Sequence, residues 1–83
     1  MIEHIVHFFK AEFSYTWHLN LPFRLVKGDE IHYELLINRG ELQYDKELSD
    51  EFFELKFDEF LFVEDLQIDH NGDIVVWLDI PKS

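Results

Sequence analysis

The chain has 83 residues, no cysteine, fourteen aromatic residues and a formal net charge of -11. That length fits a single domain covering residues 1–83, and the lack of cysteine excludes a disulfide framework and a zinc–thiolate site. The negative charge argues against direct binding to nucleic acid, because such binding needs cations that neutralise the phosphates.

The sequence predicts no membrane-spanning segment and no export signal. No apolar run approaches the roughly 20 residues that a membrane helix needs. Glu3, His4 and His7 interrupt the start of the chain, which also lacks the basic stretch that opens a signal peptide. We therefore expect a cytoplasmic protein that does not contact a membrane.

The first two predicted elements are strands, at 2–9 and 12–21. In the first, β-branched and aromatic residues dominate, but the apolar positions fit neither a two-residue nor a helical period, so a short helix is the alternative. The second alternates throughout: from Phe13 to Leu21 each odd position is apolar and each even position is polar. That alternation predicts a strand with one buried and one exposed face.

The next predicted strand covers 30–37 and follows a turn in which Gly28 takes a positive φ. Alternate residues of this strand are apolar, and Leu36 is the exception on its polar face. Residues 38–40 end in glycine and have the composition of a three-residue hairpin loop. Residues 41–44 would then form a short returning strand, which makes a second hairpin.

Residues 45–63 fit two patterns almost equally well. Ser49 could cap a helix near 49–57 whose first turn carries acidic residues. Residues 53–57, however, alternate between apolar and charged side chains, as in a strand. We adopt the helix near 49–57, followed by a strand that starts close to residue 60.

The last two predicted strands, 60–69 and 73–80, form a hairpin around Asn71-Gly72, a strong turn sequence. A two-residue loop there would divide the apolar residues between both faces of the hairpin. A three-residue loop, 70–72, closed by a left-handed glycine, gathers them onto one face, and we prefer it for that reason. The face that it assembles consists of Leu66, Ile68, Ile74, Val76 and Leu78.

The three-residue loop leaves Val75 and Trp77 on the face away from the core. Leu36 could join them there from its own strand. Exposed apolar patches mark partner surfaces, and tryptophan is common among interface anchors. Val75, Trp77 and Leu36 are therefore the candidate interface. The alternative is that a helix, or the far wall of a barrel, covers them within the chain.

The sequence contains no catalytic or metal-binding motif, so we expect no cofactor and no enzymatic activity. His18 and His32 lie on the polar faces of predicted strands, and if those strands paired they could join a carboxylate in binding a metal. Residues 69–73 resemble part of a calcium loop, but the frame and the distal glutamate of such a loop are missing. A hairpin turn accounts for these five residues.

Together these patterns predict a mainly β fold: a small antiparallel barrel or strongly curved sheet of about five or six strands, with one short helix near 49–57. The function predicted first is a non-catalytic protein-interaction or structural module that forms a homodimer or small homo-oligomer. An alternative is an acidic decoy or inhibitor for a basic protein surface, because residues 41–73 hold twelve acids against two bases, a net of -10. The third is a small metal-dependent or acid/base enzyme that uses His18 and His32.

Overall fold

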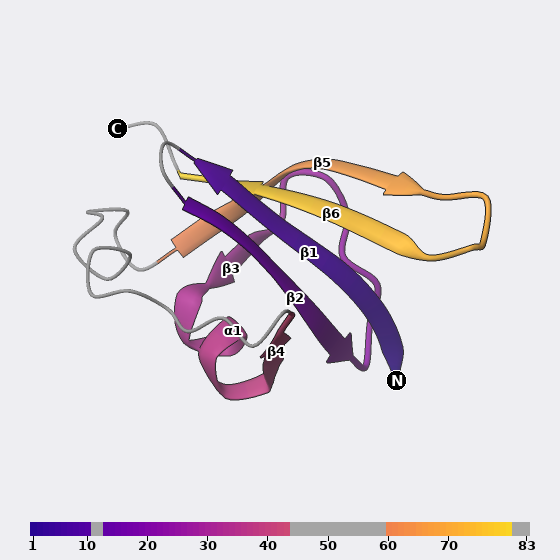
Figure 1. Ribbon diagram of the computed structural model, residues 1–83, viewed down its shortest axis with the longest axis horizontal. Helices are drawn as coiled ribbons and strands as arrows, with labels where there is room; N and C mark the ends of the chain where they lie inside the picture. The colour runs from indigo at the N-terminus through magenta and orange to yellow at the C-terminus, as the bar shows by residue number, and fades with distance from the viewer. Residues whose placement is uncertain (11–12, 44–59, 81–83) are drawn as a thin grey trace.

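A curled six-stranded sheet forms most of the protein (Figure 1). The computed structural model describes residues 1–10, 13–43 and 60–80. Its elements are β1 (Ile2–Lys10), β2 (Phe13–Leu21), β3 (Glu30–His32), α1 (Tyr33–Arg39), β4 (Gly40–Leu42), β5 (Phe60–Ile68) and β6 (Ile74–Asp79). The mainly β fold with a strongly curved sheet is confirmed.

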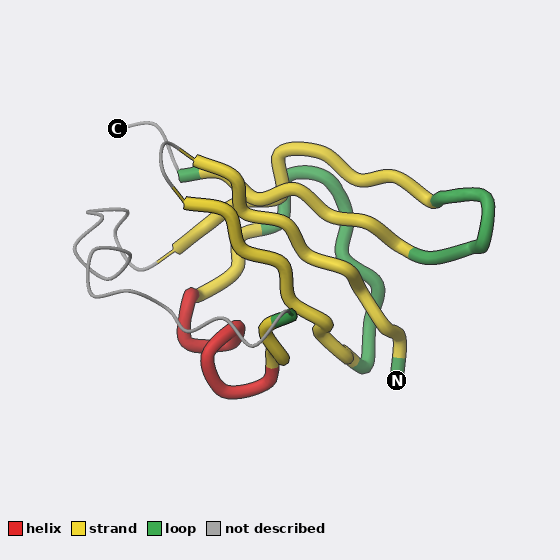
Figure 2. Tube along the Cα trace, in the orientation of Figure 1, coloured by secondary structure: helices red, strands yellow, loops and turns green. Residues whose placement is uncertain are grey.

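The strands lie in the order β3-β5-β6-β1-β2-β4. Neighbours are antiparallel except β1 and β6, which run parallel at the centre of the sheet. The outermost strands, β3 and β4, are joined directly by α1, which has seven residues. Because seven helical residues span only about 10 Å, the sheet must curl until its two edges lie close together. Figure 2 shows the helix, in red, connecting these two edge strands.

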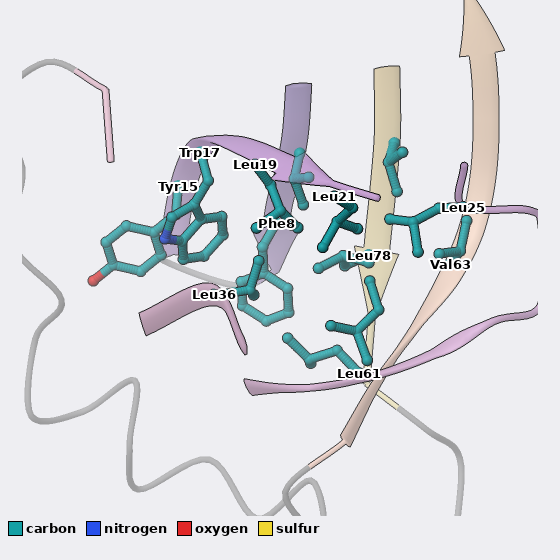
Figure 3. Packing of buried hydrophobic residues seen from close by; sticks show 13 residues of the cluster. Phe8, Tyr15, Trp17, Leu19, Leu21, Leu25, Leu36, Leu61, Val63 and Leu78 are labelled. Atoms are coloured by element: carbon teal, nitrogen blue, oxygen red, sulfur yellow. The ribbon is translucent and has the colours of Figure 1, made fainter. Parts of the chain in front are cut away.

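The core fills the inner side of the curl, where side chains converge from α1, from every strand except β4 and from the loop after β2 (Figure 3). The odd positions of β2 supply a continuous row of buried residues, as the alternation from Phe13 to Leu21 predicts. The buried hydrophobic residues are Val6, Phe8, Tyr15, Trp17, Leu19, Leu21, Leu25, Ile31, Leu36, Leu61, Val63, Val76 and Leu78.

The final hairpin has the three-residue loop predicted for it. The Gly72 amide donates to the Asp69 carbonyl and the Asp69 amide to the Asp73 carbonyl, both at 3.0 Å, and Gly72 has a φ of 86°. Ile68 consequently pairs with Ile74 across the hairpin. The Asp69 carboxylate accepts bonds from the Asn71 and Asp73 amides at 2.9 and 3.0 Å, so it serves the turn.

The predicted strand at 30–37 is wrong beyond its first three residues. β3 ends at His32, whose Nδ1 atom accepts a hydrogen bond from the Glu34 amide at 3.1 Å and so caps α1. Leu36, the exception to the alternation, is the buried residue of the helix, only 1% exposed. Leu36 lies in the core and cannot belong to an outer interface, so that part of the candidate interface is also wrong.

The predicted second hairpin is wrong as well. β4 pairs with β2, with Gly40 beside Leu19, and not with the segment before it. Gly40 is extended, with a φ of -81°, and its amide donates to the Leu36 carbonyl at the end of α1. Of the other predictions, the helix near 49–57 and the end of the 41–44 strand lie outside the described residues.

His4 ties the loop that follows β2 to the start of β1. It is completely buried, and its Nε2 atom accepts a hydrogen bond from the Leu25 amide at 3.1 Å. Its Nδ1 atom donates to the Ile2 carbonyl, also at 3.1 Å. One ring nitrogen accepts and the other donates, so both polar atoms of this buried ring are hydrogen-bonded.

Replacing His4 by leucine should lower the free energy of unfolding by about 1–3 kcal/mol, because the buried Leu25 amide would lose its acceptor. Urea denaturation measures this loss. The control is His70→Leu, in the exposed hairpin loop, where a change below about 0.5 kcal/mol is expected. Equal losses in the two variants would contradict the role assigned to His4.

Gly40→Ala should also destabilise the protein, here because of a close approach. A Cβ atom at residue 40 would lie 2.5 Å from the Leu36 carbonyl oxygen and 2.8 Å from Cδ1 of Trp17. The oxygen belongs to the helix backbone and the indole is fixed in the core, so we expect a loss of about 1–3 kcal/mol in urea. Asn38→Ala, at an exposed position of the same helix, should not lower stability, and a Gly40→Ala protein of unchanged stability would refute the argument.

Candidate functional site

An apolar strip runs along the outer face of the two central strands. The parallel register sets Ile5 of β1 beside Val75 of β6, and His7 beside Trp77. Phe9 continues the strip along β1 and is 53% exposed, while the other four residues are half-buried. We call these five residues, Ile5, His7, Phe9, Val75 and Trp77, the outer strip.

Polar residues border the outer strip on both sides. From β2, Thr16 lies opposite His7 and His18 opposite Ile5. From β5, Asp65 and Gln67 lie opposite the two strip residues of β6. An exposed apolar patch with a polar border is typical of a protein-interaction surface.

His7 holds the centre of the outer strip together. Its ring centroid lies 4.9 Å from that of Phe9 and 5.7 Å from that of Trp77. Its Nδ1 atom is 2.9 Å from the Thr16 hydroxyl oxygen. Partial burial lowers the pKa of His7 below its ordinary value of 6.5, because charging the ring would cost solvation. At neutral pH the outer strip therefore carries no charge.

The two histidines considered as metal ligands are not brought together. β2 pairs with β1 and β4, whereas β3 pairs with β5, so His18 and His32 are not cross-strand neighbours. His18 bonds Glu3 at 2.7 Å and contacts the Gln43 side chain. His32 instead packs its ring against Tyr33 and Phe60. Across 1–10, 13–43 and 60–80, no group of three or more histidines and carboxylates could hold a metal ion.

An open hollow of about 520 Å³ adjoins the outer strip at Trp77. Its other described lining residues are Lys27, Glu64 and Asp65. The two acids lie at an irregularity in the pairing of β5 with β6, where the register shifts between Val63 and Asp65. A β-bulge of this kind redirects side chains and is common beside functional sites.

The structure separates the three predicted interface residues. Val75 and Trp77 lie on the outer face, where the three-residue loop predicts them, and Leu36 lies in the core. Prediction missed the contribution of β1, that is, Ile5, His7 and Phe9. The available signal was the irregular apolar pattern of 2–9, because a strand with apolar residues on both faces shows no clean period.

The chain matches no family model, no curated protein and no solved structure. Within the described ranges, no helix is long and apolar enough to cross a membrane.

The lowered pKa of His7 predicts a pH effect on stability. The folded state resists protonation of His7, so neutral His7 favours folding. This contribution to the free energy of unfolding is fully present above pH 6.5. It is lost as the pH falls from 6.5 to the lower pKa of the folded state. His7→Asn keeps a polar partner for Thr16 but cannot titrate. In urea denaturation from about pH 7.5 to about pH 5, the stability of the native protein relative to His7→Asn should therefore decrease. The other four histidines are present in both proteins, so their effects cancel in this comparison. A stability difference between the two proteins that stays constant with pH would contradict the prediction.

Proposed function

We propose that this protein is a non-catalytic interaction module that self-associates, as a homodimer or small homo-oligomer, through the outer strip. The observation that carries the proposal is the position of Trp77 among apolar neighbours on the outer face of the two central strands. The helix that the structure describes lies on the other side, with Leu36 in the core, and so does not cover the strip.

Strand pairing supports this reading. Parallel strands at the centre of a sheet are normally covered on both faces. In β1 and β6 the inner positions Val6 and Val76 are fully buried, while the outer positions Ile5 and Val75 are also apolar but only half-buried. Covering this second face by another protein surface would complete the burial that the sequence provides for.

The size of the outer face is sufficient for a dimer. The two longer dimensions of the molecule are 34 and 30 Å, and stable interfaces bury on the order of 800 Å² on each partner. A two-fold dimer places the same patch of both copies in contact, so the outer strip would pack against itself. Phe9, which is 53% exposed, and Trp77 are the two large aromatic side chains of the strip and would form the centre of this contact.

Charge opposes this association and gives it a recognisable salt dependence. Two copies that each carry a net charge of -11 repel one another. Added salt shortens the range of that repulsion, to about 10 Å at 0.1 M, and leaves the apolar contact intact. Self-association should therefore strengthen with salt, whereas binding of an acidic decoy to a basic protein should weaken.

Sedimentation equilibrium tests the proposal. We expect dimers or small oligomers whose dissociation constant falls as salt is added. Val75→Lys should raise that constant at least about tenfold, because it sets an ammonium group in the apolar strip. Asn38→Lys, on the exposed side of α1, makes the same change in net charge and should have little effect.

A protein that stays monomeric at every concentration and salt would refute self-association. Equal effects of Val75→Lys and Asn38→Lys would refute the role of the outer strip. Trp77→Ala provides a second variant should Val75→Lys disturb folding, because it removes the largest contact surface without adding a charge.

A further inference from the structure

One edge of the sheet is open along the second half of β5. β3 pairs only with Phe60–Phe62, and the loop before it adds two hydrogen bonds at Val63: Gly28 donates to the Val63 carbonyl at 2.9 Å, and the Val63 amide donates to Asp29 at 2.8 Å. Past Val63, no described strand pairs with β5 on the side away from β6. The Leu66 amide instead donates a hydrogen bond to the carboxylate of its neighbour Asp65, at 2.9 Å.

An open edge of this kind offers backbone donors and acceptors to another extended chain. The side chains along Glu64–Ile68 determine which kind of chain could pair here. Glu64, Asp65 and Gln67 are exposed and polar. Leu66 and Ile68 are apolar, and Ile68 remains 51% exposed although it belongs to the inner face. A strand added here would meet two acids first, and then apolar Leu66 and Ile68 on either side of neutral Gln67.

The hollow adds a specific pocket at the start of this open edge. Its lining combines the Trp77 indole with the carboxylates of Glu64 and Asp65. An aromatic face together with carboxylates suits a guanidinium or ammonium group, which gains both a cation–π contact and charge-assisted hydrogen bonds. Lys27 is the one cation among the described lining residues, against two carboxylates.

We propose that an extended basic segment of a partner protein adds to the sheet as a strand beside Glu64–Ile68 and places an arginine or lysine side chain in the hollow. Its residues would alternate, with basic side chains toward the acids and apolar side chains toward Leu66 and Ile68. A second copy of this chain fits poorly, because its own edge would bring Glu64 and Asp65 against the same acids. The inference goes beyond self-association, because it uses the backbone edge of β5. The two surfaces adjoin at Trp77, and Asp65 and Gln67 lie between them.

Peptide titrations followed by NMR of the isotope-labelled protein test this inference. The probe is a blocked peptide in which arginine alternates with valine. It should bind and shift the amide signals of Leu66, Gln67 and Ile68 and the indole signal of Trp77. The same peptide with N-methylated backbone amides should bind about tenfold or more weakly, because it cannot donate to a strand.

Two further probes separate the possible sources of the cation. A peptide with glutamate in place of arginine should not bind. N-acetylarginine amide carries the same cation without a strand, so equally tight binding of this small molecule would overturn strand addition and leave a small-cation site. Binding of the arginine–valine peptide that is insensitive to N-methylation would overturn it too.

Matched variants locate the binding. Glu64→Lys should weaken the peptide about tenfold, whereas Glu41→Lys, the same change on the exposed face of β4 at the other edge, should weaken it less than about twofold. Equal losses would show general attraction to an acidic protein and would overturn the site. Phe9→Ala removes an aromatic side chain of the outer strip on β1, which does not pair with β5, and adds no charge. It should weaken self-association and leave peptide affinity within about twofold. If peptide binding instead required a monomer, the edge would be a contact between copies and the inference would fall.

Discussion

The short connection between the two outermost strands constrains the whole structure. α1 leads directly from β3 to β4, so the sheet has to curl until its edges are one short helix apart. Gly40 fits closely against the Leu36 carbonyl and the Trp17 indole, where a larger residue would collide. The Leu36 side chain, on the same helix, lies in the core. The inner side of the sheet is thereby filled, and no described helix is left to cover the outer side.

The open outer side gives the central strands their unusual composition. A half-barrel needs apolar residues on its inner side only, yet β1 and β6 carry them on both sides. His7 makes the outer positions compatible with folding, because it is neutral, hydrogen-bonded to Thr16 and packed between Phe9 and Trp77. The outer strip is therefore ordered within one chain and still available to another surface.

The local sequence pattern was enough to predict the elements that have one apolar and one polar face. β2 alternates strictly, and the last hairpin follows from Asn71-Gly72 and from the requirement for one apolar face. The strand prediction for residues 30–37 was wrong because Ile31, Tyr33 and Leu35 alternate with polar residues, as they would in a strand. Two features decide for a helix. The His32 cap is a local bond to the Glu34 amide, whereas the burial of Leu36 against a curled sheet depends on contacts distant in sequence.

The candidate site was predictable only in part, for the same reason. Val75 and Trp77 follow from the register of a single hairpin, which local turn chemistry determines. Ile5, His7 and Phe9 join them through a parallel pairing between the two ends of the chain, which no local pattern encodes. The hollow likewise requires the loop at Lys27 to meet the bulge of β5.

The acidity of the protein acts on its two surfaces in opposite directions. It weakens contact between two outer strips, because like charges approach, and it favours a cationic strand at the edge of β5, because unlike charges approach. These effects are coupled: a basic segment bound at Glu64–Ile68 would neutralise part of the charge that keeps two copies apart. By linkage, association of the copies would then tighten binding of the segment by the same factor, at most about twofold. A strongly negative chain of this kind would then assemble more readily once a basic segment is bound at that edge.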